Sequence, residues 1–143
     1  MDNSIEIKSV SKSFGESHAV RGASLTVREG ELFGVLGPSG CGKSTLLRLI
    51  MGFERPDAGT ITVRGKLLAD PASGFFTPPE RRRIGMVVQD YALFPHLTVL
   101  QNVKFGLRDR GRDERAQTAA RALELVGLQH KAERHPHELS GGE

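Results

Sequence analysis

A glycine-rich loop that ends in lysine and serine carries the clearest chemistry in this sequence. Residues 37–45 read GPSGCGKST, the complete G-x-x-x-x-G-K-S/T pattern of a phosphate-binding loop. Glycines let backbone N–H groups curl around phosphate oxygens, and a helix that begins at the loop adds unpaired donors and partial positive charge. We expect Lys43 to reach the β- and γ-phosphates of a nucleotide and Ser44 to place its hydroxyl on Mg²⁺. An ordinary glycine-rich turn that binds no ligand does not require a lysine and a serine at these positions, so the pattern favours a phosphate-binding loop.

The overall composition is that of a globular protein with a mild positive charge. The chain has 143 residues, of which 38% are hydrophobic and 26% charged, and its net charge is +3. A single cysteine, Cys41, excludes an internal disulfide and a multi-cysteine zinc site. Its thiol at a helix start could be reactive, but the pattern favours a small residue tolerated in the loop. Because no apolar run approaches the roughly 18 residues of a membrane span and no signal peptide is recognisable, we expect a cytoplasmic chain.

Two other groups of side chains are interpreted as solvated loops. The dense basic run, 81–83, lacks the wide stripe and interleaved aromatics that nucleic-acid binding requires, so no nucleic-acid partner is predicted. Four of the chain's five histidines follow no zinc-binding spacing, and no second ligand set accompanies them. They are His96, His130, His135 and His137.

The phosphate-binding loop must be held between a strand and a helix. Residues 31–36, ELFGVL, form a near-continuous apolar run that predicts a strand buried on both faces. From Lys43 the apolar residues follow helical spacing, and Gly52 closes the predicted helix. Residues 84–88 predict a second buried strand, whereas 66–79, rich in proline and glycine, are typical of a loop.

The segments on either side of this core have different patterns. Residues 5–10 alternate apolar with polar side chains and 19–27 form a second half-exposed strand, which together predict an antiparallel opening. A turn at 56–59 leads into a strand at 60–63.

Beyond Gln89 the pattern becomes helical. Apolar residues in 116–126 follow helical spacing, Asp113 can cap the start of that helix, and Gly127 can supply a left-handed cap at its end. The last residues, 139–143, read LSGGE.

Four segments, in this order, resemble the ATP-binding subunits of ABC (ATP-binding cassette) transporters. They are the aromatic Phe14, the loop 37–45, Gln89 after a predicted strand, and LSGGE at 139–143, which this family usually ends in Gln. The final Glu keeps the Ser and both Gly, so only the last side chain's contacts differ. The resemblance implies an α/β P-loop NTPase core with an N-terminal antiparallel β segment in 1–90, followed by a helical subdomain in 91–143.

The resemblance also assigns roles to the motifs. It implies that Phe14 stacks on adenine, that Val20 lies near the ribose, and that Gln89 contacts Mg²⁺ or the attacking water. Lys43 and Gln89 are then the catalytic residues, and Ser44 and Gln89 the metal ligands. The alternatives are a core aromatic at Phe14, a solvated loop at Gln89 and a flexible tail at 140–142. The implied nucleotide-binding residues are Phe14, Val20, Gly37, Pro38, Ser39, Gly40, Cys41, Gly42, Lys43, Ser44, Thr45, Ser140, Gly141 and Gly142.

By the same resemblance, the protein couples ATP hydrolysis to solute import at the cytoplasmic face of the inner membrane. The implied partners are a membrane permease, a second ATP-binding subunit in a head-to-tail dimer and a solute-binding protein. Residues 79–103 are similar to importers for ferric iron, polyamines and sulfate, and the loop 65–79 favours ferric iron. Residues 91–99 either contact a short cytoplasmic helix of the permease or form local core.

The family's Walker B strand, with its Mg²⁺-anchoring Asp and general-base Glu, follows the signature motif and is not among these residues. We therefore expect that the C-terminal part of the domain is missing, that the 31–36 segment is left uncovered, and that the 143 residues alone do not hydrolyse ATP. The alternatives are a soluble ABC ATPase that acts on nucleic acid or ribosomes, and a non-catalytic nucleotide-binding fragment.

Overall fold

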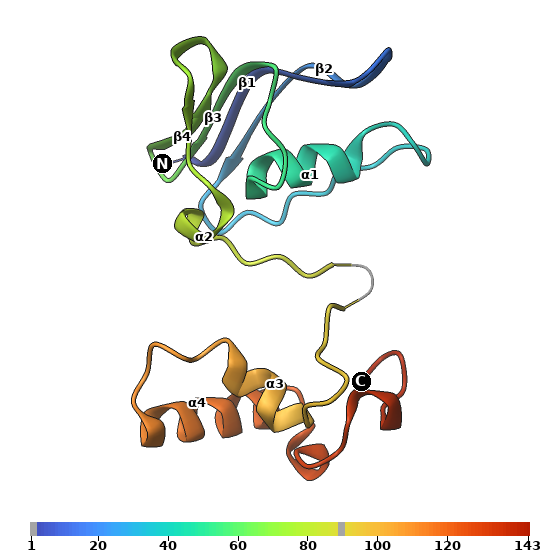
Figure 1. Cartoon of the computed structure of the whole chain (residues 1–143), viewed down its shortest axis with the longest axis vertical. Coiled ribbons are helices and arrows are strands. Elements are labelled where there is room, and N and C mark those ends of the chain that lie inside the picture. The colour runs from blue at the N-terminus through green and yellow to red at the C-terminus, as the bar shows by residue number, and fades with distance from the viewer. Residues whose placement is uncertain (1–2, 89–90) are drawn as a thin grey trace. The chain divides into compact units, whose positions relative to one another are not determined.

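An antiparallel sheet forms the framework of the N-terminal half of the protein (Figure 1). The structure, a computed structural model, describes residues 3–88 and 91–143, which divide into two units, Met1–Met86 and Val87–Glu143. In the described part of the chain, no helix has both the length and the apolar character needed to cross a membrane. The first unit contains β1 (Asn3–Phe14), β2 (Ser17–Arg28), β3 (Ala58–Val63), β4 (Lys66–Asp70) and β5 (Phe75–Phe76).

The predicted antiparallel opening is confirmed and is longer than expected. The strands lie in the order β2-β1-β3-β4-β5, and every neighbouring pair is antiparallel. Ile7 of β1 pairs with Leu25 on one side and with Ile61 on the other. Paired residues have their side chains on the same face of a sheet, so these three apolar side chains lie side by side on one face. The third strand begins at Ala58, two residues before the predicted start.

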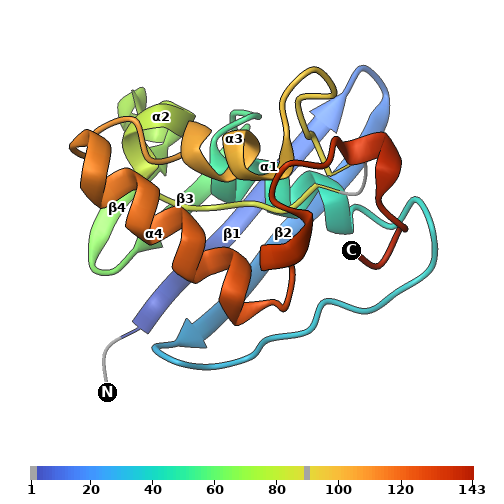
Figure 2. The same cartoon turned by 90° about the horizontal axis from the view of Figure 1, so that it is seen from below.

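The predicted helix is confirmed as α1 (Lys43–Met51), which packs on one face of the sheet (Figure 2). Left-handed glycines flank it, with φ of 95° at Gly42 and 85° at Gly52. Helical spacing places its buried side chains on one side, against the apolar residues of the sheet. This core consists of Ile7, Val10, Val20, Leu46, Leu49, Ile50, Ile61 and Ala69.

The prediction of a loop over residues 66–79 is wrong at two places, because 66–70 form β4 and 75–76 form β5, which pairs with it. Strand β4 buries Leu68 and Ala69, and Ala69 pairs with Ile61 of β3. Proline and glycine dominated the sequence pattern, but Pro71 follows the strand and opens a short 3-10 turn, Pro71–Ser73. Asp70 caps that turn by accepting a hydrogen bond from the backbone N–H of Ala72.

The predicted buried strands at 31–36 and 84–88 are not formed. Leu32, Leu36 and Val87 are almost fully exposed, with exposed fractions of 101%, 94% and 88%. A strand needs neighbours that accept and donate its backbone hydrogen bonds. Within residues 3–88 and 91–143, the sheet does not extend to either segment. The side chains of 31–36 are uncovered as expected, but their backbone is not a strand.

The middle residue of the arginine run 81–83 is buried, which corrects the prediction of a solvated loop. Arg82, at the end of α2 (Pro79–Arg82), is 6% exposed. Its Nε donates a hydrogen bond to the carbonyl of Thr77 at 2.7 Å, and its Nη1 donates to those of Leu49 and Ile50 at 2.8 Å. A cation at the end of a helix interacts favourably with the helix dipole. Burial lowers the pKa of the Arg82 guanidinium.

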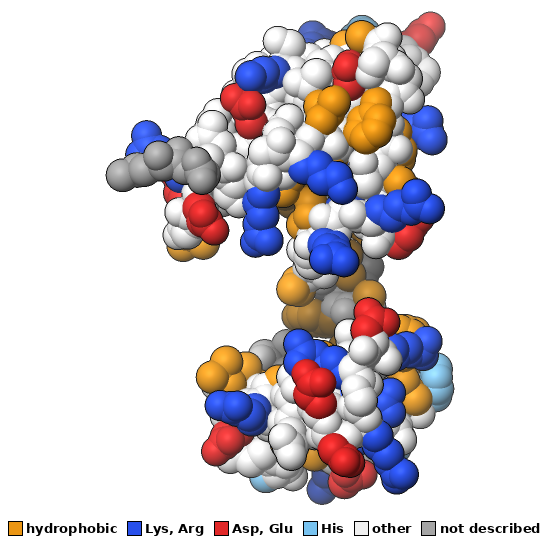
Figure 3. Space-filling view, turned by 90° about the vertical axis from the view of Figure 1, so that its left-hand side faces the viewer, with side chains coloured by type: hydrophobic (Ala, Val, Ile, Leu, Met, Phe, Trp, Pro, Cys, Tyr) orange, Lys and Arg blue, Asp and Glu red, His pale blue; other side chains and the backbone are white. Residues whose placement is uncertain are grey.

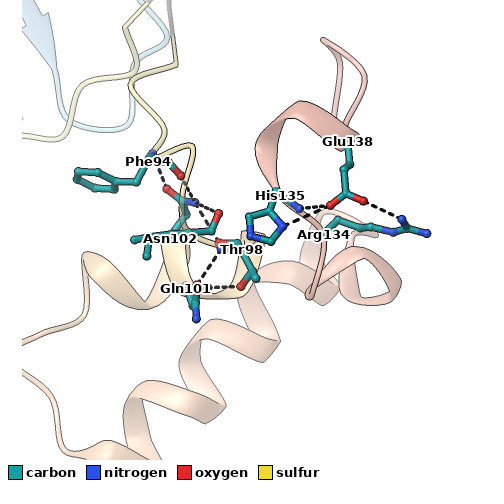
Figure 4. A network of polar contacts seen from close by, with 8 residues as sticks. Phe94, Thr98, Gln101, Asn102, Arg134, His135 and Glu138 are labelled. Atoms are coloured by element: carbon teal, nitrogen blue, oxygen red, sulfur yellow. Dashed lines mark hydrogen bonds and ion pairs between the residues drawn. The ribbon is translucent and has the colours of Figure 1, made fainter.

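The second unit is helical, as predicted, and contains one helix, α3 (Val99–Phe105), that the sequence pattern did not single out. Helix α3 begins with a reciprocal capping box between Thr98 and Gln101 (Figure 4). Helix α4 (Arg112–Leu125) ends before Gly127, whose φ of 71° confirms the predicted left-handed residue. The 3-10 turns Gln129–Lys131 and Pro136–Glu138 follow.

The predicted cap of α4 is wrong by two positions. The capping residue is Gly111, and Asp113 lies inside the first turn. There its carboxylate still interacts favourably with the positive end of the helix dipole. Ala119 and Leu123 of this helix are buried.

Arg82 offers a test of the packing of α1. Replacing Arg82 by Met leaves the carbonyls of Leu49, Ile50 and Thr77 without their donor, so we expect the free energy of unfolding to fall by about 1–3 kcal/mol. Denaturant unfolding of the intact protein measures this change, with Arg81→Met, at an exposed neighbour, as the control. Equal stability of the two variants would contradict the role given to Arg82.

Candidate nucleotide-binding site

The phosphate-binding loop ends where α1 begins, and the backbone at its last two glycines favours glycine over any other residue. Gly40 and Gly42 have φ of 80° and 95°, in the left-handed region that L side chains rarely adopt. The first hydrogen bond of the helix joins Leu46 N to Gly42 O at 2.8 Å. The N–H groups of residues 43–45 precede that bond and are unpaired donors at the helix start, where the helix dipole also favours an anion.

The ammonium of Lys43 lies within the phosphate-binding loop. Its Nζ donates hydrogen bonds to the carbonyls of Gly37 at 2.7 Å and Pro38 at 2.6 Å, and it lies 3.6 Å from the Sγ of Cys41. The side chains of Cys41 and of Ser44, the residue after Lys43, are exposed. The loop therefore presents a cation, several backbone donors and a hydroxyl together, which suits a phosphate group.

The end of the loop is pressed against the second strand. A Cβ built on Gly42 would run into the carbonyl of Ala19 and would lie 3.6 Å from a methyl group of Val20. Val20 is 8% exposed and belongs to the core. Of the two residues assigned to the nucleoside, Val20 therefore lies beside the phosphate-binding loop.

Phe14 lies at the end of β1 and is 47% exposed, so it is not the core aromatic of the alternative interpretation. The ammonium of Lys12 lies over its ring, 5.3 Å from the centroid, and 3.0 Å from Oδ1 of Asp57. The other carboxylate oxygen of Asp57 accepts a hydrogen bond from the backbone N–H of Ser13 at 2.7 Å. This backbone bond, followed by the bond from Lys12, lowers the pKa of Asp57.

Sequence reasoning missed Lys12 and Asp57. A signal for Lys12 exists, because residues two apart on a strand lie on the same face, so Lys12 and Phe14 are neighbours on β1. Asp57 carries no such signal, since it reaches Ser13 from 44 positions away.

The LSGGE segment forms a closed turn in the second unit. The backbone N–H of Glu143 donates to the carbonyl of Ser140 at 3.0 Å, and a carboxylate oxygen of Glu143 accepts from the N–H of Ser140 at 2.9 Å. Glu143 also forms an ion pair with Lys131, and chiefly this contact lowers the pKa of Glu143 to about 2. Gly141 and Gly142 are exposed.

Two other sequence assignments fall in or next to this unit. Gln89 lies outside the described residues. In the segment 91–99, Tyr91 and Leu93 are exposed, with exposed fractions of 61% and 48%, whereas Val99 is buried. The apolar side chains of this segment are thus divided between surface and core.

Figure 3 shows acidic and basic side chains interspersed over one face of the molecule.

The donor set suits Mg²⁺ held together with phosphate. The described residues contain no group of three His, Cys, Asp or Glu side chains placed to hold a metal ion. Mg²⁺ needs no such cage, because it is usually bound by one or two protein oxygens together with substrate phosphates and water. The exposed hydroxyl of Ser44, next to Lys43 at the helix start, has the oxygen chemistry that such a ligand requires.

Residues 20–143 match the sequence profile of the family described as ABC transporter. The chain is 49% identical over 144 residues to the spermidine/putrescine import ATP-binding protein of Nitratidesulfovibrio vulgaris, covering 99% of this chain and 38% of that protein. It is also 49% identical over 147 residues to an Fe(3+) ions import ATP-binding protein of Rhodococcus jostii, covering 100% of this chain and 40% of the relative. The chain thus spans about two-fifths of the length of these relatives.

The fold is similar to that of a solved ATP-binding cassette. That structure is a dimer in a post-hydrolysis state, bound to ADP and inorganic phosphate. It matches with a TM-score of 0.78 and 32% sequence identity, over 96% of this chain and 64% of the cassette.

The contact between Gly42 and β2 can be tested by adding one methyl group. We expect Gly42→Ala to lower stability by about 1–3 kcal/mol, because the left-handed backbone and the Ala19 carbonyl both oppose a Cβ. Thermal unfolding of the intact protein measures the loss. Gly106→Ala is the matched control, since Gly106 has an ordinary helical φ of −73° and a Cβ there meets only the Val103 carbonyl, at 3.9 Å. A loss of equal size in both variants would overturn this explanation.

Proposed function

This chain belongs to the ABC transporter family, and on that premise we propose that it is the nucleotide-binding part of a subunit that hydrolyses ATP to drive solute import. The observation that carries the proposal is the position of Lys43, whose ammonium lies within a glycine loop at the start of α1. A cation there, with the helix dipole behind it, offsets the charge of bound phosphates.

The residues of the loop have separate tasks in this proposal. Backbone N–H groups from 37–45 bind phosphate oxygens, and Lys43 neutralises charge on the β- and γ-phosphates. Ser44 and Gln89 would hold Mg²⁺, which would supply positive charge against the phosphate oxygens. Lys43 and Gln89 position and stabilise but neither is a general base, so hydrolysis needs a further carboxylate.

The nucleoside and the second subunit complete the site. We assign Phe14 to stacking on adenine and Val20 to the ribose side, since Phe14 offers an exposed ring near the strand that contacts Gly42. The turn Ser140–Gly142 is assigned to the γ-phosphate of a nucleotide held by a second subunit in a head-to-tail dimer. The dimeric form of the solved cassette supports this assignment.

The remaining partners follow from import as the function. A membrane permease would bind the ATP-binding subunits at the cytoplasmic face of the inner membrane, and a solute-binding protein would deliver the solute. Among solutes we favour ferric iron, because the loop 65–79 is similar to that of ferric-iron importers, and polyamines are the alternative. Overall identity does not separate the two, since relatives named for each are 49% identical to this chain. Uptake of labelled ferric iron and labelled spermidine by the reconstituted transporter separates the two solutes.

Lys43 provides the direct test of the phosphate-binding loop. In the intact protein assembled with its permease, we expect Lys43→Ala to abolish ATP-driven uptake, because the γ-phosphate loses its cationic partner. Uptake into proteoliposomes and phosphate release are measured together. The exposed Lys8 serves as the control through Lys8→Ala, and wild-type ATP turnover in Lys43→Ala would refute the assignment.

Phe14 tests the position of the base. Phe14→Ala should weaken ATP binding by about 0.5–1.5 kcal/mol, the usual value of an aromatic stacking contact, whereas Phe14→Tyr and Phe14→Trp should retain affinity. Equilibrium titration of the intact protein with ATP measures the change. If Phe14→Ala binds ATP as the wild type does, the base must be held elsewhere.

A further inference from the structure

We propose that Lys12 and Asp57 are positioning residues for the base, which fix the ring of Phe14 so that a purine stacks on one face of it only. This inference rests on the proposed function, in which Phe14 stacks on adenine. It concerns a different part of the site from the phosphate-binding loop, and it assigns a role to two charged residues outside the sequence motifs.

Lys12 is held over the ring rather than extended into solvent. Its side chain is 14% exposed, its Nζ lies 5.3 Å from the centroid of Phe14, and it forms a 3.0 Å ion pair with Asp57. A cation over the face of an aromatic ring is attracted by the negative charge of that face. An aromatic ring has two faces, so a base can stack only on the face that the ammonium leaves free.

Asp57 ties the strand that carries Phe14 to the segment leaving α1. The pairing of β1 with β3 ends at Ser11 and Ala58, so β3 offers no acceptor to the last residues of β1. The Asp57 carboxylate supplies one by accepting the N–H of Ser13 at 2.7 Å, while its own N–H donates to the carbonyl of Ser11 at 2.8 Å. These bonds fix the backbone on the N-terminal side of Phe14.

The ion pair also neutralises the charge that Lys12 would otherwise contribute to phosphate binding. With Asp57 as its partner, Lys12 adds no net charge to the site, so it does not act as a second phosphate-binding cation. Its effect should therefore depend on the base of the ligand and be absent for a ligand that has phosphates alone. This difference separates a positioning role from general electrostatics or from a loss of folding.

The test compares ATP with inorganic tripolyphosphate as ligands of the intact protein. Lys12→Met is made together with Asp57→Asn, so that the pair stays neutral and the charge near the phosphates does not change. We expect this double variant to weaken ATP binding about two- to fivefold, the size of an exposed cation–π contact, and to leave tripolyphosphate binding unchanged. Lys12→Arg keeps the cation and the ion pair, so it should restore ATP affinity. Lys8→Met with Glu6→Gln is the matched control, because this ion pair lies on the same strand and is distant from the ring. If the double variant fails to fold, Lys12→Gln with Asp57→Asn replaces it with the same expectations.

A double-mutant comparison links the lysine to the ring. In a Phe14→Ala background, the neutral double variant Lys12→Met/Asp57→Asn should have no further effect on ATP binding. Equal weakening of ATP and tripolyphosphate binding by the neutral double variant would overturn the inference. So would weakening by Phe14→Ala without any effect of the neutral double variant, although the proposed function would then stand. No effect of Phe14→Ala itself would remove the base-stacking role, and this inference with it.

Discussion

The fold of the nucleotide-binding unit depends on how tightly α1 is held at both of its ends. Gly42, before the helix, leaves no space for a side chain beside the Ala19 carbonyl, and Gly52, after it, leaves none beside Arg82. Between these contacts the apolar face of the helix packs on the sheet. The phosphate-binding loop continues directly into the first turn, so the direction of its N–H groups is set by the same contacts. Close packing at the two glycines fixes the position of the helix, and with it the positions of the hydrogen-bond donors at its start.

Charged side chains in this unit work at the ends of elements, where the backbone lacks partners. Arg82 donates to the last carbonyls of α1, and Asp57 accepts an N–H near the end of β1. Both replace hydrogen bonds that a longer helix or a longer neighbouring strand would have made. The two interactions differ in exposure, since Arg82 is buried and the Asp57 side chain is 47% exposed. The first chiefly stabilises the fold, and the second chiefly orients the chain around Phe14.

Local patterns in the sequence were sufficient to predict the loop, α1 and the antiparallel opening, because each is encoded within a few neighbouring residues. The strands predicted at 31–36 and 84–88 are not formed. An apolar run indicates that a segment is to be buried, but a strand also needs a neighbouring strand for its backbone hydrogen bonds, and the run itself says nothing about that neighbour. In 66–79, prolines and glycine concealed β4, whose burial depends on pairing with β3. The contacts of Lys12 and Arg82 join residues far apart in the sequence, so only the tertiary structure reveals them.

The side-chain amide of Asn102 makes four polar contacts with an irregular segment, and one of its two N–H groups is shared between two carbonyls. Its Nδ2 donates to the carbonyls of Phe94, Leu97 and Thr98 at 3.0–3.1 Å, and its Oδ1 accepts the N–H of Phe94 at 2.9 Å (Figure 4). Segments without regular structure normally lose conformational entropy when another molecule orders them. Here the chain has already lost that freedom on folding, through a single side chain. Molecular recognition at 94–98 would therefore proceed as rigid-body docking, with little entropic cost for ordering the backbone.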